Sequence, residues 1–277
     1  MGNKNHTLPP PLPHKERSGE SLSVVYEDNH IIIVNKKSGE IVQGDKTGDP
    51  PLSDFVKQYI KEKYQKPGEV FLGVVHRLDR PVSGLVVFAR TSKALSRLNK
   101  MFASKEEIKK TYWAIVETHP QPLPHREGSL CVFPKQDSHL PSLQGGAGGG
   151  SAVGGYLLTH WLTRNEQQNK SYAHDHEVPG SKKAMLRYKV MAMGDRYALL
   201  EVQLLTGRHH QIRCQLSAIG CPIRGDLKYG ARRSNPDGSI SLLSRSIEFV
   251  HPVSKETIIT EAPLPHDPLW QTLADKA

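Results

Sequence analysis

GVVHRLDRPVSGLVVFAR, residues 73–90, joins a charged loop directly to an apolar run of β type. The loop places one carboxylate, Asp79, between two guanidinium groups, Arg77 and Arg80. Two nearby positive charges favour the ionised carboxylate, which can act as a nucleophile or a base but not as a general acid. A salt-bridged surface turn is the simpler interpretation, and the loop alone leaves both interpretations open.

The residues after Asp79 predict a rigid loop. Pro81 restricts the backbone, and Gly84 permits a close approach where the chain enters the next strand. A positioned reactive group needs this kind of support. No competing catalytic motif is present: the chain has no GxSxG elbow, no P-loop and no HExxH.

Short runs rich in β-branched residues lie on both sides of this stretch and predict strands. Several follow one another too closely for a crossover helix, which favours a mixed, mainly antiparallel sheet. Apolar residues at helical spacing predict three helices, over 52–65, 91–107 and 207–220. We therefore expect an α+β fold with flanking helices and strands over 23–28, 30–36, 84–90, 111–117, 186–193, 197–207, 246–252 and 257–263.

Composition divides the 277 residues into three parts. Residues 1–20 are polar and proline-rich, which predicts a disordered tail. Residues 118–155 are full of Pro, Gly and Ser, and we interpret them as a flexible insertion, with a functional lid as the alternative. The remainder of 21–277 is long enough for one catalytic domain.

The net charge of +9 is concentrated in two separate blocks. Residues 76–110 carry nine basic and three acidic side chains, and residues 181–233 carry eleven and three. If folding joins the blocks, they form one basic face suited to a phosphate backbone, although basic proteins also bind acidic lipids and proteins. No apolar run approaches ~18 residues, so no membrane span is expected.

Metal-binding patterns are missing from the sequence. The cysteines Cys131, Cys214 and Cys221 form no CxxC pair, which favours a reducing, cytoplasmic location. His174 and His176 flank an aspartate in what we take as a polar loop. No second ligand pair stands at zinc-finger spacing, so no metal site is predicted.

The stretch HRLDRPVSGLVVFAR resembles the signature of the RluA-type pseudouridine synthases, with Val82 where Thr is more usual. Three further segments resemble family motifs in order: KKTYWAIV (109–116), LLTGRHHQIRCQLSAIGCPIRGDLKYG (204–230) and SIEFVHPVSKE (246–256). The opening VVYEDNHIIIVNKKSGEIV resembles the first hairpin, with Lys37 replacing a usual proline. The likeness covers residues 22 to 265 apart from 118–155.

The resemblance implies isomerisation of uridine in RNA to pseudouridine, with Asp79 as the essential catalytic residue. Arg213 is expected to pair with Asp79, and Tyr112 to pack on the flipped uracil and to be a candidate acceptor of the C5 proton. Arg77 is expected to enter the RNA stack when the target base leaves. Further residues expected to contact RNA are His76, Arg80, Lys110, Arg208, His210 and Gln211.

The same resemblance implies no cofactor, because the isomerisation is redox-neutral. Members of the family act on ribosomal or transfer RNA, and many carry an N-terminal RNA-binding domain. Only about 20 polar residues precede the first hairpin here, too few to bury a core, so we expect a single-domain monomer without a separate N-terminal RNA-binding domain. Two alternatives remain at this level: a catalytically silent RNA-binding or chaperone protein on the same fold, and a nucleoside or glycoside hydrolase. The hydrolase usually needs two neighbouring acids.

Overall fold

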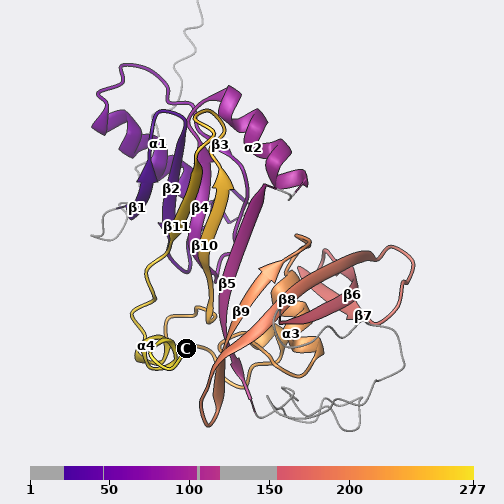
Figure 1. Ribbon diagram of the computed structural model, residues 1–277. Helices are drawn as coiled ribbons and strands as arrows, with labels where there is room; N and C mark the ends of the chain where they lie inside the picture. Colours follow the sequence, from indigo (N-terminus) through magenta and orange to yellow (C-terminus); the bar gives the residue numbers. More distant parts are fainter. Residues whose placement is uncertain (1–21, 46, 105–106, 119–154) are drawn as a thin grey trace, which may run out of the picture.

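The computed structural model describes residues 22–45, 47–104, 107–118 and 155–277 (Figure 1). The predicted tail, 1–20, lies outside the described residues. So does the predicted insertion, 118–155, apart from its first and last residues.

One 11-stranded sheet organises the described chain, in the order β1-β2-β4-β10-β5-β9-β8-β6-β7, with β11 paired to β10 and β3 to β4. The pairing of β4 with β10 is parallel, and the other pairings among the described strands are antiparallel. The predicted mixed, mainly antiparallel sheet is confirmed. The strands are β1 Val24–Glu27, β2 Ile31–Lys36, β3 Gly73–Val74, β4 Ser83–Ala89, β5 Ile108–Glu117, β6 Tyr156–Asn165, β7 Lys170–His174, β8 Lys182–Met193, β9 Tyr197–Leu204, β10 Leu242–Val250 and β11 Thr257–Glu261.

The three predicted helices are present as α1 (Leu52–Lys63), α2 (Ser92–Ser104) and α3 (Gln211–Ala218). Helix α3 begins four residues later than expected, because His210 adopts a left-handed conformation with φ of 50° that an α-helix does not contain. A short 3₁₀ helix, η1 (Leu227–Tyr229), and a last helix, α4 (Pro268–Ala274), were not predicted.

Apolar side chains cover both faces of the sheet and make two core layers. Helices α1 and α3 contribute to one layer through residues such as Val56 and Leu216. Helices α2 and α4 contribute to the other through residues such as Leu98 and Trp270. Strand β4 lies between the layers, so its residues 85–89 are all fully buried. The continuous apolar run that follows the Asp79 loop is thus a central strand.

The expected polar loop around His174 is wrong in part, because Lys170–His174 forms strand β7. Together β6 and β7 extend the sheet beyond β8, on the side where α3 packs (Figure 1). Among the described residues, no group of three or more His, Cys, Asp or Glu side chains is placed to hold a metal ion. No helix in this part of the chain is long and apolar enough to cross a membrane.

Candidate active site

A cleft of about 390 Å³ lies between the loop that joins β3 to β4, strand β5 and the turn that leads into α3. Segments 134 residues apart in sequence meet here, at Asp79 and Arg213. Nine of the ten residues that the sequence analysis singled out line this cleft: His76, Arg77, Asp79, Lys110, Tyr112, Arg208, His210, Gln211 and Arg213. The tenth, Arg80, does not.

Asp79 has one oxygen held by the protein and one that is not. Nη1 of Arg213 donates a hydrogen bond to Oδ2 at 3.1 Å, and Nε2 of His210 lies 3.5 Å from the same atom. Within the described residues, Oδ1 has no hydrogen-bond or ion-pair partner. The side chain is 32% exposed, so the second oxygen is available to a ligand in the cleft.

Arg213 is itself fixed by a second carboxylate. Its Nε and Nη2 donate to the two oxygens of Asp226 at 2.7 and 2.9 Å, a bidentate pair in which Asp226 is 1% exposed. Burial alone would lower the pKa of Arg213, but the hydrogen bonds and charge of Asp226, with those of Asp79, raise it above its usual value. Arg213 is therefore a permanent cation that bridges the two acids.

His210 contacts Asp79 as a neutral imidazole. Burial, followed by the charge of Arg213, lowers the pKa of His210 to about 2. Its Nδ1 lies 3.0 Å from the hydroxyl of Tyr229, and that hydroxyl already accepts the amide N–H of Ser171 at 2.8 Å. The tyrosine proton is thus left to donate to Nδ1, which places the imidazole proton on Nε2, facing Asp79.

A buried lysine fastens the loop that carries Asp79. Lys36, at the end of β2, is 0% exposed, and its ammonium donates to the backbone carbonyls of Lys37, Arg80 and Val82 at 2.9, 3.1 and 2.6 Å. Burial lowers the pKa of Lys36 to about 8. Two of these carbonyls follow Asp79 on its C-terminal side, so the lysine restricts how far the loop can move.

Gly84 makes the close approach that the sequence predicts. Its φ is +112°, and a Cβ atom there would lie 2.4 Å from the carbonyl oxygen of Ser244 in β10. The loop can therefore enter β4 beside β10 only because residue 84 has no side chain.

Tyr112 projects from β5 into the same cleft and is 6% exposed. Burial, with a smaller contribution from the charge of Asp79, raises the pKa of Tyr112 to about 12, although a hydrogen bond with Ser244 opposes the shift. At neutral pH the side chain is a phenol, which favours a packing role over that of a base.

Both basic blocks of the sequence contribute to this cleft, as expected. Arg77 and Lys110 come from the first block and Arg208 from the second. The exposed Arg77 has no hydrogen-bond or ion-pair partner in the described part of the chain, whereas Nε of Arg208 donates to the carbonyl of Lys183 at 3.1 Å. Arg164 of β6 also lines the cleft and lies outside both blocks.

The expected charge pairing of Asp79 with Arg77 and Arg80 is wrong. Arg77 has no ion-pair partner in the described part of the chain, and Nη2 of Arg80 lies 2.6 Å from Oδ2 of Asp49, outside the cleft lining. The guanidinium that holds Asp79 is that of Arg213, as the family resemblance implies.

Two cleft residues use their polar atoms inside the protein. Nε2 of His76 accepts the amide N–H of Val87 at 3.1 Å, and burial lowers the pKa of His76 to about 3, so this ring is neutral. The amide of Gln211 accepts from the hydroxyl of Thr206 at 2.7 Å and from the N–H of Arg208 at 2.9 Å. Both side chains support the cleft wall, and neither offers a positive charge to a phosphate.

The sequence pattern of the family described as RNA pseudouridylate synthase matches residues 30–218. The chain belongs to this family. The match spans the Asp79 loop, β5 and α3, the three elements that build the cleft, and the family prediction is confirmed. The reaction of this pseudouridine synthase is the conversion of uridine in RNA to pseudouridine.

Curated relatives agree with this assignment. The synthase is 31% identical to the uncharacterized RNA pseudouridine synthase YhcT of Bacillus subtilis, over 89% of this chain and 70% of the relative. It is 29% identical to the tRNA pseudouridine synthase C of Vibrio vulnificus, over 92% and 95%. It is 27% identical to the ribosomal large subunit pseudouridine synthase D of Zymomonas mobilis, over 94% and 75%.

The solved structure of human RNA pseudouridylate synthase domain containing 4 has the same fold as this synthase. It superposes with a TM-score of 0.64 at 19% identity, covering 92% of each chain. The α+β fold that the sequence predicts is confirmed.

Sequence reasoning missed four residues that support the site of the synthase. They are Lys36, Arg164, Asp226 and Tyr229. Asp226 and Tyr229 belong to the quoted segment 204–230, so the signal was present as part of a motif. Their partners could not be assigned without the fold.

Proposed function

We propose that this synthase extrudes a uridine from structured RNA into the cleft and isomerises it with Asp79 as the catalytic residue. The observation that supports the proposal is the arrangement of Asp79: Oδ2 is held by Arg213 and His210, and Oδ1 is left without a protein partner in the described chain. A carboxylate held in this way is oriented before the substrate arrives.

The reaction balances without a co-reactant. The bond between N1 of uracil and C1′ of ribose breaks with its electron pair on uracil, the base rotates, and C5 bonds to C1′. The C5 proton is then released and N1 gains a proton, so the product is an isomer. Asp79 can attack C1′, attack the base, or remove a sugar proton, and each of these routes uses an ionised carboxylate.

We assign the other cleft residues to binding and flipping. The neutral ring of Tyr112 packs on the extruded uracil. Arg77, which is exposed and without a partner in the described chain, fills the space that the base leaves, because a planar guanidinium stacks well on bases. Lys110, Arg164 and Arg208 bind phosphates, since they line the cleft and carry charge to its rim.

The proposed substrate is ribosomal or transfer RNA, because both kinds appear in the names of the relatives. We further propose a cytoplasmic monomer that acts without a metal or cofactor, with one catalytic domain over residues 21–277. Residue charges in the cleft support an RNA partner, and the balance of the reaction supports the lack of a cofactor.

The test is carbodiimide mapping of pseudouridines in total RNA from cells with and without the gene. We expect the wild-type gene and an Asp49→Asn control to restore every mark that the deletion removes, and an Asp79→Asn gene to restore none. Asp49 is a suitable control because it pairs with Arg80 outside the cleft.

The second candidate, a silent RNA-binding protein, is disfavoured by the presence of Asp79, Tyr112 and Arg213 in one cleft. It predicts that no mark disappears on deletion while purified protein still binds RNA. Restoration of the marks by Asp79→Asn, with the asparagine verified by mass spectrometry, would contradict the assigned role of Asp79.

A further inference from the structure

Strands β5 and β9 separate next to the catalytic cleft. They pair from Glu117 and Tyr197 as far as Thr111 and Gln203. The next residues, Lys110 and Leu204, pair with β10 and β8 instead. The sheet therefore forks at this point, and Lys110 and Leu204 stand at the start of the gap.

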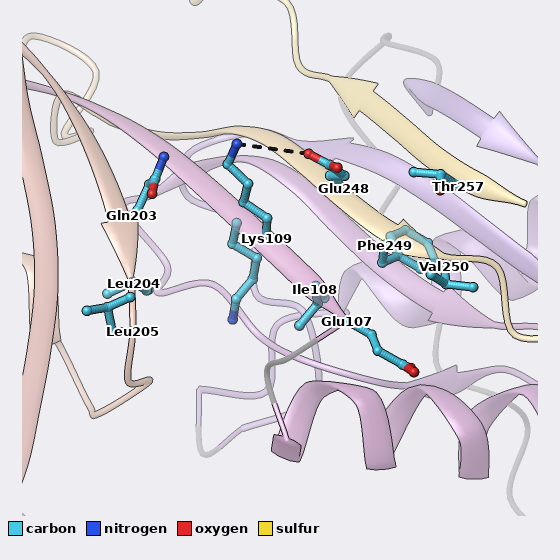
Figure 2. Close-up of a pocket in the computed structure, with 11 residues that line it drawn as sticks. Glu107, Ile108, Lys109, Gln203, Leu204, Leu205, Glu248, Phe249, Val250 and Thr257 are labelled. Atoms are coloured by element: carbon cyan, nitrogen blue, oxygen red, sulfur yellow. Dashed lines mark ion pairs between the residues drawn. The ribbon is translucent and has the colours of Figure 1, made fainter. Parts of the chain in front are cut away.

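A second cavity, of about 460 Å³, opens at this fork and extends across β5 to residues of β10 and β11 (Figure 2). Lys110 and Leu204 line both this cavity, which we call the fork pocket, and the catalytic cleft. The two cavities are thus neighbours that share two lining residues.

The fork pocket is lined by apolar side chains and by one amide side chain that has no hydrogen-bond partner among the described residues. Ile108, Val250 and Leu205 contribute apolar atoms, and Leu205 is 38% exposed. Gln203 lies beside Lys109 on the neighbouring strand (Figure 2), and its side chain makes no hydrogen bond within the described residues. An amide of this kind offers both a donor and an acceptor to a ligand.

The charges in the fork pocket nearly cancel. Nζ of Lys109 lies 4.0 Å from Oε2 of Glu248, and a further acid, Glu107, lines the pocket. Such a lining gives little attraction for a phosphate. It matches a nucleobase, which has an apolar face and a hydrogen-bonding edge.

We propose that the fork pocket binds a second, unpaired base of the substrate RNA, close in sequence to the target uridine. The inference rests on the proposed function of the catalytic cleft. With the target base in the cleft and its neighbour in the fork pocket, the connecting backbone crosses the ammonium of Lys110, the cation common to both walls. Gln203 then reads the edge of the second base, and Ile108 and Leu205 support its face.

The test uses a stem-loop RNA that carries the mapped uridine, and a set of the same RNA with one abasic nucleotide at each flanking position. Turnover and binding are measured for the wild type, Gln203→Leu, Leu205→Asn and a control, Gln271→Leu. Gln271 lies on α4 and lines neither cavity. Binding is measured in the Asp79→Asn background, so that turnover does not consume the RNA.

We expect Gln203→Leu to raise Kd and KM by about 5- to 10-fold, the effect of one lost hydrogen bond, with kcat unchanged. One abasic position should produce the same loss in the wild type and no further loss in Gln203→Leu. Leu205→Asn should weaken binding of the same base, and Gln271→Leu should have no effect.

Normal binding and turnover by both pocket variants, with no single abasic position that weakens the wild type, would overturn the inference and leave the proposed function intact. Equal losses at every abasic position, additive with Gln203→Leu, would also overturn it. Failure of the wild-type enzyme to modify any RNA is a different outcome, because it would remove the proposed function itself.

Discussion

The hydroxyl of Tyr229 lies 3.0 Å from Nδ1 of His210, on the side of the imidazole opposite Asp79. Tyr229 is 5% exposed and His210 is 8% exposed, so water does not easily replace this contact. The tyrosine proton sets the tautomer of the histidine, and the histidine in turn presents an N–H to the carboxylate. Tyr229 is therefore a positioning residue for Asp79.

Replacing Tyr229 with Phe removes that hydroxyl and frees the imidazole to change tautomer. The buried N–H of Ser171 and Nδ1 of His210 also lose their partner. These unsatisfied groups should lower stability by about 1–3 kcal/mol. The less well oriented carboxylate should lower kcat roughly 10- to 100-fold, about 1.4–2.7 kcal/mol in the barrier, with the KM for RNA nearly unchanged. Single-turnover kinetics at several RNA concentrations separate the effect on kcat from the effect on KM.

The control is Tyr64→Phe, which removes a tyrosine hydroxyl that bonds Glu27, outside the cleft lining. It should change stability without changing kcat. A Tyr229→Phe enzyme that lost RNA affinity but kept its kcat would show that Tyr229 acts on binding and not through Asp79.

Arg77→Ala should impair turnover of a uridine in duplex RNA more than of the same uridine in an unpaired loop. Extruding a stacked, paired base costs a few kcal/mol, and the guanidinium recovers part of that by occupying the gap. The control is Arg196→Ala, since Arg196 is exposed and lines neither cavity. Equal losses on both RNAs would count against intercalation.

We expect the buried Lys36 to make the free energy of unfolding depend on pH. Its pKa is about 8 in the folded protein and 10.5 is its ordinary value. Between these pH values the unfolded chain keeps a proton that the native state has lost, so the unfolding free energy contributed by Lys36 rises with pH. The difference between wild type and Lys36→Met should grow by up to about 3 kcal/mol in favour of the wild type from pH 8 to pH 10.5.

Urea unfolding across this pH range measures the effect, and Lys57→Met serves as control because the side chain of Lys57, on α1, is 42% exposed. Parallel stability curves for wild type and Lys36→Met would show that the lysine does not titrate in this window.

Gly84→Ala should destabilise the protein and displace the Asp79 loop. The new Cβ would meet the backbone of Ser244 in a conformation that L residues rarely adopt, and we expect a loss of at least about 2 kcal/mol. Gly39→Ala is a matched control, since its φ is +86° and a methyl group added there would meet no atom within 4 Å. Denaturant unfolding compares the two, and equal midpoints would contradict a role for the close approach.

The Asp79 loop and the buried strand after it were accessible from local patterns in the sequence. The pairing of Arg213 with Asp79, 134 residues away, was accessible only through the family resemblance. Arg80 was misassigned because adjacent side chains in a turn point in different directions. Its true partner, Asp49, lies 31 residues earlier in the chain. The acid next to Arg80 in the sequence is therefore not the acid that it pairs with in the fold.

Other features of the site depend on tertiary contacts. Lys36 ends a strand, where a lysine is usually solvated, yet it is 0% exposed beneath the loop. Tyr229 reaches His210 only because η1 folds back after α3. The strands β6 and β7 contain β-type residues but were not predicted, because they follow the segment 118–155, which is rich in Pro, Gly and Ser.

The position of β10 in the sheet bears on how the enzyme is made. This strand, residues 242–250, lies between β4 and β5, so a strand that comes late in the sequence occupies the middle of the sheet. During translation, β4 and β5 emerge long before the strand that separates them. The chain must therefore be synthesised as far as β10 before β4 and β5 can take their final places on either side of it. Premature termination upstream of residue 242 should yield no active enzyme.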